Sequence, residues 1–261
     1  MDRSDELADV VNGLIEEGEA FRRVRAVSAS PARSRPARGA RVFHAGMAVA
    51  FLLTTFAGFA PTYFLRGLSD RPPLSPLLHV HGLVFTSWLL LLLTQTVLVA
   101  RYRVDWHRRL GIAGAVLAAV MVPLGIMAGI AGARHGIITG GSEPLVFLIF
   151  PLGQMVLFAA FVGAAVWKRR QPESHRRLIL LSTAVVVTPA ISRIPFVPNP
   201  IAALGLSTLF VAAGIVHDWR SRGRVHPVYI WGGLIILVSG PVRFALGQTG
   251  AWQAFARLLV E

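Results

Sequence analysis

The chain has 261 residues, of which 54% are apolar and only 15% are charged, whereas a soluble domain usually carries about 25% charged residues. The low charge leaves uncharged stretches longer than the 18 or so residues that suggest a membrane span. There is no cysteine, so disulfides, thiol nucleophiles, iron–sulfur clusters and cysteine-based zinc sites are excluded. The formal net charge of +13 comes from arginines in short segments between apolar stretches, so we expect a membrane face and no nucleic acid as their partner.

The first 42 residues are predicted to form a cytoplasmic amphipathic helix and a basic linker. Between residues 4 and 25, apolar side chains recur at the spacing of one helix face, at Leu7, Val10, Val11, Leu14 and Ile15. Residues 26–41 are rich in Ala, Ser, Pro and Arg, which is typical of a flexible linker. Two interpretations stay open: the region is disordered, or the helix over 4–25 docks on the membrane or on a protein partner.

The rest of the chain predicts an all-α fold, a polytopic membrane bundle of seven transmembrane helices. The apolar stretches run roughly over 43–64, 75–99, 108–133, 144–167, 177–197, 199–217 and 227–247. The connections between them are short, as expected for antiparallel neighbours in one bundle. Residues 43–247 are therefore expected to form one transmembrane domain, followed by a short outer tail over 248–261.

The basic residues divide unequally between the two sides of this predicted bundle. Of the 26, 20 fall on the N-terminal segment and the connections on its side, and six fall on the other side. Because cytoplasmic segments carry the excess of arginine and lysine, this bias predicts an N-in, C-out multi-pass protein of the bacterial inner membrane. The arginine-rich flank of the first span also fits a signal peptide, but six further spans favour a signal anchor.

Each helix predicted to run outward begins with a histidine and has a proline 14 to 17 residues later. The pairs are His44 and Pro61, His107 and Pro123, His175 and Pro189, and His226 and Pro241. A rise of about 1.5 Å per residue puts each proline in the outer leaflet, where kinked helices would open a cavity to the outside. The inner histidines and their arginine neighbours are expected to meet anionic headgroups. The alternative is that the spacing has no shared role, because prolines are ordinary in membrane helices and histidines are ordinary at membrane interfaces.

Two arginines lie within predicted spans, at the level of the outer leaflet. Arg193 follows Pro189, and Arg243 follows Pro241. An arginine at such depth is costly and usually faces a cavity or a partner. The predicted spans contain no Asp or Glu, which counts against a proton pump or cation-coupled carrier and favours an anionic ligand. The alternative is that both arginines extend to the outer headgroups.

The second predicted span adds histidines near the same level. His81 lies on one stripe of this helix with Gln95, whereas His79 points to nearly the opposite side. We therefore expect an outward-facing pocket that binds an anionic amphiphile, a quinone or haem b. Its candidate residues are His81, Arg193, Arg243, His79, His135 and Gln95. A histidine that only bonds within the helix interface is the alternative for His81.

Haem b needs axial ligands, often two histidines from different helices, and basic groups for its propionates. His81 with His135 or another outer donor, beside Arg193 and Arg243, meets that description. Paired histidines on a small helical bundle loosely resemble b561-type cytochromes. The chain departs from that family because its histidines sit at helix ends and not a few turns inside.

Four motifs, HGLVFTSW, WHRRLG, HRRL and RVHPVYIWGG, more closely resemble a group of uncharacterised bacterial seven-span membrane proteins. The resemblance covers most of residues 75–247 and implies the fold only. Besides the binding function, two alternatives stay open: an accessory subunit that docks a partner through residues 4–25, and a zinc-dependent membrane hydrolase. The hydrolase is disfavoured because there is no HxxxH pair and no aspartate within the spans. Whether the protein is an enzyme stays open.

Overall fold

The structure is a computed structural model that describes residues 13, 15–19, 38–68, 73–134 and 143–261. These residues form helices and turns, with no strand among them, so the all-α class is confirmed. The chain divides into two units, residues 1–37 and 38–261. In the first unit residues 13 and 15–19 are helical, and the rest of the helix predicted over 4–25 lies outside the described residues.

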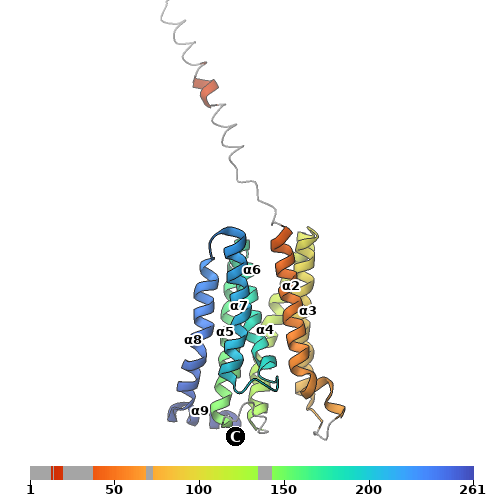
Figure 1. Cartoon of the computed structure of the whole chain (residues 1–261), viewed down its shortest axis with the longest axis vertical. Helices are drawn as coiled ribbons and strands as arrows, with labels where there is room; N and C mark the ends of the chain where they lie inside the picture. Colours follow the sequence, from red (N-terminus) through yellow and green to blue (C-terminus); the bar gives the residue numbers. More distant parts are fainter. Residues whose placement is uncertain (1–12, 14, 20–37, 69–72, 135–142) are drawn as a thin grey trace, which may run out of the picture. The chain divides into compact units, whose positions relative to one another are not determined.

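The second unit is a bundle of long helices that lie side by side (Figure 1). Its helices follow the predicted spans: α2 (Arg38–Phe59) continued by η1 (Ala60–Phe64), α3 (Pro76–Ala100), α4 (Val104–Arg134), α5 (Pro144–Trp167), α6 (Pro172–Ile191), α7 (Pro200–Arg222) and α8 (Pro227–Gly247). A short helix, η2 (Arg66–Leu68), follows η1. Six of the helices in the described part of the chain are long and apolar enough to cross a membrane, α6 not being among them.

Proline fixes where most of these helices begin. The first residue is a proline in α3, α5, α6, α7 and α8. Proline suits this position because its fixed φ matches the helix and its missing N–H would have no partner there. Side chains cap two of the starts: Asn199 Oδ1 accepts from Ala202 N at 2.8 Å, and His226 Nδ1 accepts from Val228 N at 3.2 Å.

Helix α6 is the central helix of the bundle and packs against α2, α5, α7 and α8. Polar side chains occur along it, but Ser182, Thr183 and Thr188 are buried and donate to backbone carbonyls one turn earlier. Trp88 of α3 also donates to Thr183 Oγ1 at 3.2 Å. A buried helix can carry such residues because its neighbours satisfy them.

The prediction that the fifth span continues to residue 197 was wrong. Helix α6 ends at Ile191, and residues 192–199 form turns. Pro195 and Pro198 explain this end, because each lacks an N–H and disfavours the helical conformation of the residue before it. Arg193 therefore lies just beyond the helix end and not within the helix.

Glycines allow the closest approaches between helices. At Gly58 of α2, a Cβ atom would lie 2.0 Å from the carbonyl oxygen of Ala190 in α6. Gly125 and Gly129 of α4 both face α5, where they meet Met155 and Pro151. The bundle core around these contacts is largely apolar, with Phe51, Met121 and Phe158 completely buried.

The C-terminal residues form a further helix, α9 (Gly250–Val260), where the sequence predicted only a short tail. Thr249 caps its start by accepting from Trp252 N at 3.2 Å. Helix α9 packs on α4 and α5: Trp252 Nε1 donates to Leu145 O at 2.8 Å, and Arg134 donates to the carbonyls of Leu259 and Val260. In Figure 1 it lies at the opposite end of the bundle from the start of α2.

Candidate functional site

The two ends of the bundle differ in charge. One of them, the basic end, comprises the start of α2 and the connections over 101–103, 168–171 and 223–226, where arginines are concentrated. The other, the α9 end, comprises η1, η2, α9 and the turns over 192–199. The predicted outward pocket belongs to the α9 end.

At the α9 end the structure brings Arg193 close to His81. The half-buried Arg193 donates from Nη1 to Pro189 O at 2.6 Å, and its guanidinium lies 4.6 Å from the ring centre of Phe59. The His81 ring lies 4.0 Å from that of Phe85, centre to centre, and is near enough to Arg193 for electrostatic interaction. Among the described residues nothing hydrogen-bonds to the buried His81 Nδ1.

Arg243 has a different environment from Arg193. It is 6% exposed and lies between α8 and α5. Its guanidinium donates to Ser239 O at 2.9 Å, to Ser239 Oγ at 3.0 Å and to Phe150 O at 3.0 Å. Gly153 provides the space, because a Cβ there would lie 2.4 Å from Arg243 Cδ. Arg243 is thus hydrogen-bonded within the protein, and its partners are not those of Arg193.

The other predicted site residues lie elsewhere. His79 Nδ1 is 2.9 Å from the hydroxyl of Tyr63, on the η1 side of α3. Gln95 lies near the basic end, where its Nε2 donates to His107 O at 3.1 Å. His135 lies outside the described residues. Of the six predicted residues, His81 and Arg193 are the pair that the structure places near one another.

The basic end contains a buried ion pair that was not predicted from the sequence. Arg177 of α6 and Asp218 of α7 are each 1% exposed. Arg177 Nε donates to Asp218 Oδ2 at 2.8 Å, and Nη2 donates to Oδ1. Its third nitrogen, Nη1, donates to Glu173 Oε2 at 2.8 Å and to Glu173 O at 2.7 Å. All three guanidinium nitrogens therefore have acceptors.

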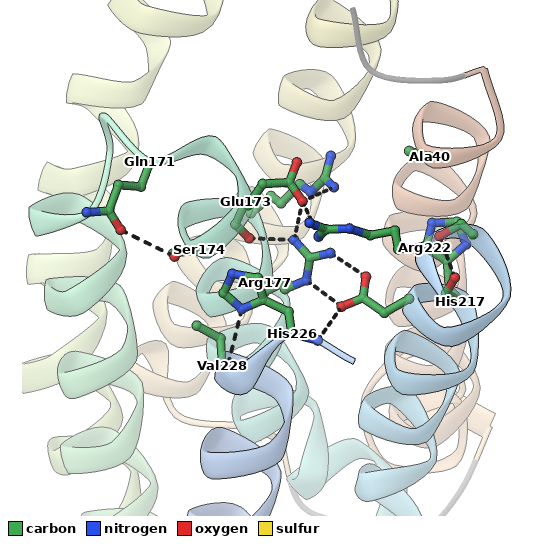
Figure 2. A network of polar contacts seen from close by, with 12 residues as sticks. Ala40, Gln171, Glu173, Ser174, Arg177, His217, Arg222, His226 and Val228 are labelled. Carbon is green, nitrogen blue, oxygen red and sulfur yellow. Dashed lines mark hydrogen bonds and ion pairs between the residues drawn. The ribbon is translucent and has the colours of Figure 1, made fainter. Parts of the chain in front are cut away.

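This pair is the centre of a larger ion-pair cluster made by Glu173, Arg176, Arg177, Asp218 and Arg222. Glu173 Oε2 also accepts from Arg176 at 2.7 Å and from Arg222 at 2.5 Å. Asp218 Oδ2 accepts from the backbone N–H of His226 at 3.1 Å, just before α8. The cluster joins α6, α7 and the start of α8 (Figure 2).

Glu173 of this cluster and the neighbouring His226 lie outside the predicted spans, and both have lowered pKa values. Burial raises the pKa of Glu173, but the hydrogen bond from Arg177 and the charges of Arg176 and Arg222 outweigh it, so the pKa lies below its ordinary 4.5. Burial and the charges of Arg177 and Arg222 hold the pKa of His226 below its ordinary 6.5. Both shifts favour the ionisation states that the hydrogen bonds require.

Asp218 was missed because the sequence placed it beyond a span ending at 217. Helix α7 in fact continues to Arg222, so Asp218 is a helical residue, and it lies on the buried face of α7. Ser207, Val211 and Gly214 precede it at helical spacing and are all buried. That pattern is present in the sequence and would have marked Asp218 as an interior acid.

Two shallow hollows lie at the basic end of the described part of the bundle. The first has a volume of about 420 Å³ and is lined by Phe43, Ala213, Val216, His217, Arg220 and Ser221. The second, about 360 Å³, is lined by Arg222, Arg224, Val225, His226 and Pro227. Neither includes a residue of the predicted outward pocket.

Histidines also approach one another at the basic end. The rings of His107 and His175, which begin the two HRRL motifs, have centres 6.4 Å apart, and those of His44 and His217 are 6.3 Å apart. No group of three or more His, Asp or Glu side chains suited to a metal ion occurs within the described ranges. The zinc hydrolase therefore has no ligand set in that part of the chain.

No family model, curated protein or solved structure matches the chain. The resemblance to bacterial seven-span proteins stays a prediction, as does a partner bound through residues 4–25. Function has to be inferred from the residues themselves.

Proposed function

We propose that the protein is a multi-pass protein of the bacterial inner membrane in which all seven helices, α2 to α8, cross the bilayer. Six of them are long and apolar enough to do so, and α6 packs in their midst. The polar side chains of α6 are buried against neighbouring helices, so they need not meet lipid. The arginines concentrated at the basic end support placing that end in the cytoplasm.

Within this arrangement, the protein binds an anionic amphiphile at its outer, α9 end through Arg193 and His81. The observation that carries this proposal is the state of Arg193. Its guanidinium packs against Phe59, its described hydrogen bond goes to Pro189 O near the end of α6, and within the described part of the chain it has no carboxylate partner. A half-buried cation without a described counter-ion at this depth favours an anionic ligand. The unpartnered Nδ1 of His81 offers that ligand a second polar contact.

A quinone is the second candidate, because its carbonyl oxygen would accept from the same two groups. Haem b fits the described residues less well. It needs axial imidazoles, and His79, which bonds to Tyr63, is only two residues from His81 and therefore points away from it. Arg243 is excluded from the proposed site because its hydrogen bonds to Phe150 and Ser239 already satisfy it.

The test is to purify the protein in mild detergent, identify bound small molecules by mass spectrometry and record an absorption spectrum. We expect a co-purifying acidic amphiphile, or a quinone, that is lost in Arg193→Ala and retained in Arg257→Ala. Arg257 is an exposed arginine at the same end, so it matches the change in charge. Equal retention of the bound molecule in both variants would show that Arg193 only extends to the lipid headgroups. A Soret band in the spectrum would show that the ligand is haem and contradict the proposal.

A further inference from the structure

A shallow groove between α2 and α7 at the basic end combines apolar and basic side chains. We define the α2–α7 groove by the hollow of about 420 Å³ that Phe43, Ala213, Val216 and Arg220 line together with His217 and Ser221. Its volume is within the range of about 300–1,000 Å³ typical of ligand sites. It lies at the opposite end of the bundle from Arg193, so it is independent of the function proposed above.

The wall of the groove is apolar along one side. Phe43 of α2 stacks flat on His217 of α7, with ring centres 4.0 Å apart and planes at 2°. Beyond this stack, towards the middle of the bundle, the wall consists of Ala213 and Val216. The small side chain of Ala213 leaves the space unfilled. The acyl chain of a lipid suits this wall, because it covers apolar side chains and meets no unpaired polar group of the helix backbone.

The mouth of the groove is positively charged. Arg220 is exposed and, among the residues that the structure describes, makes no hydrogen bond or ion pair. The two acids of the ion-pair cluster already have partners: Asp218 pairs with Arg177, and Glu173 pairs with Arg176, Arg177 and Arg222. Arg220 therefore keeps a full positive charge at the rim of an apolar groove.

We infer that the α2–α7 groove binds one anionic phospholipid of the leaflet at the basic end. The phosphate pairs with Arg220, and one acyl chain lies against Phe43, Ala213 and Val216. Charge complementarity selects this occupant over a neutral lipid, because the groove contributes an unpaired cation and no free acid. The ion-pair cluster supports the selection indirectly, since it removes Asp218 and Glu173 from competition for Arg220.

Native mass spectrometry of the detergent-purified protein, titrated with phosphatidylglycerol or phosphatidylcholine, tests this inference. We expect the first phosphatidylglycerol to bind several-fold more strongly than phosphatidylcholine. Arg220→Ala should weaken that binding about fivefold, corresponding to the ~1 kcal/mol that one basic residue contributes at an anionic surface. Ala213→Leu fills the groove without changing its charge, so it should weaken the binding of both lipids.

Arg170→Ala is the matched control, because Arg170 is an exposed arginine at the same end but outside the groove. It should leave phosphatidylglycerol binding unchanged, and Arg220→Lys should restore most of it. Unchanged binding of both lipids in Ala213→Leu would show a headgroup site without a chain site and overturn the inference. Equal losses in Arg220→Ala and Arg170→Ala, or equal binding of the two lipids, would also overturn it. Unchanged thermal unfolding of each variant establishes that the fold is intact.

Discussion

At the scale of single residues, the buried pair of Arg177 and Asp218 has the clearest energetic consequence. Both side chains are almost wholly removed from solvent, and every guanidinium nitrogen of Arg177 has an acceptor. Such a pair contributes little net stability compared with an apolar replacement, but removing one partner leaves an uncompensated buried charge. The pair therefore determines which helix ends meet more than it adds to the free energy of unfolding.

Asp218→Asn should lower the free energy of unfolding by up to about 3–5 kcal/mol, because Arg177 would remain charged and buried with only the partly exposed Glu173 left to pair with it. Denaturant titration in detergent measures the change. Asp105→Asn removes an exposed acid at the same end and should cost less than about 0.5 kcal/mol. Similar effects of the two substitutions would mean that the pair is not buried as described.

The lowered pKa values of Glu173 and His226 predict that acid destabilises the basic end in two stages. As the pH falls below 6.5, the unfolded chain takes up a proton at His226 that the folded chain resists, because the neutral ring caps α8. Below 4.5 the unfolded chain takes up a proton at Glu173 that the folded chain resists, because three arginines bond to the ionised carboxylate. The contribution of these two groups to the free energy of unfolding is thus fully present above pH 6.5, and it declines as the pH falls below 6.5 and again below 4.5.

Unfolding titrations between pH 8 and pH 3 check this prediction, with Glu173→Gln as the diagnostic variant. The variant should lose much of the decline that begins at 4.5, with the part due to Asp218 remaining, and keep the decline that begins at 6.5. A variant whose lower window is as steep as that of the parent protein would assign the acid sensitivity to other carboxylates.

At the scale of helices, local sequence predicted the elements well because their boundaries are encoded locally. Prolines begin five of the helices, and Pro195 and Pro198 end α6 where the apolar pattern alone would have continued it. The two HRRL motifs illustrate what local sequence does not encode. Arg177 in the second motif is buried against Asp218, whereas Arg109 in the first is exposed beside Trp106. Identical residues differ because different helices pack against them.

The same reason limits how much of the site could be predicted. Depth along the helix placed Arg193 and His81 at one level, and in the structure the two lie within electrostatic range of one another. Depth does not give direction: Arg243 turns to α5, because Gly153 leaves room for it there and Phe150 offers a carbonyl. Such pairings depend on which helices are neighbours, and the sequence pattern of a single helix does not contain that information.

Gly58 should be the most sensitive glycine of the contact between α2 and α6. Gly58→Ala would place a Cβ against backbone atoms of Ala190, which cannot move like the end of a side chain, so we expect a loss of about 1–3 kcal/mol or more. Gly46→Ala is the control, because Gly46 lies on the same helix facing open space. Thermal unfolding in detergent should show a lower midpoint for the first variant and an unchanged midpoint for the second. Equal midpoints would contradict the close approach.

At the scale of the whole bundle, both proposed sites depend on which end faces the cytoplasm. If the basic end is inside, Arg193 and His81 face the outer leaflet and the α2–α7 groove faces the inner one. The ion-pair cluster then lies at the inner interface, where its excess arginines meet anionic headgroups. The number of spans matters equally, because a helix α6 that did not cross would put the turns over 192–199 on the other side.

Single-cysteine labelling tests this arrangement most directly, because the chain has no cysteine of its own. Arg170→Cys, Phe196→Cys and Ala254→Cys place one thiol at each of three exposed positions: the connection before α6, the turn after it, and α9. In intact cells treated with a membrane-impermeant maleimide, Phe196→Cys and Ala254→Cys should react at once, and Arg170→Cys only after permeabilisation. Labelling of Arg170→Cys in intact cells, or of Phe196→Cys only after permeabilisation, would contradict seven spans with the basic end inside.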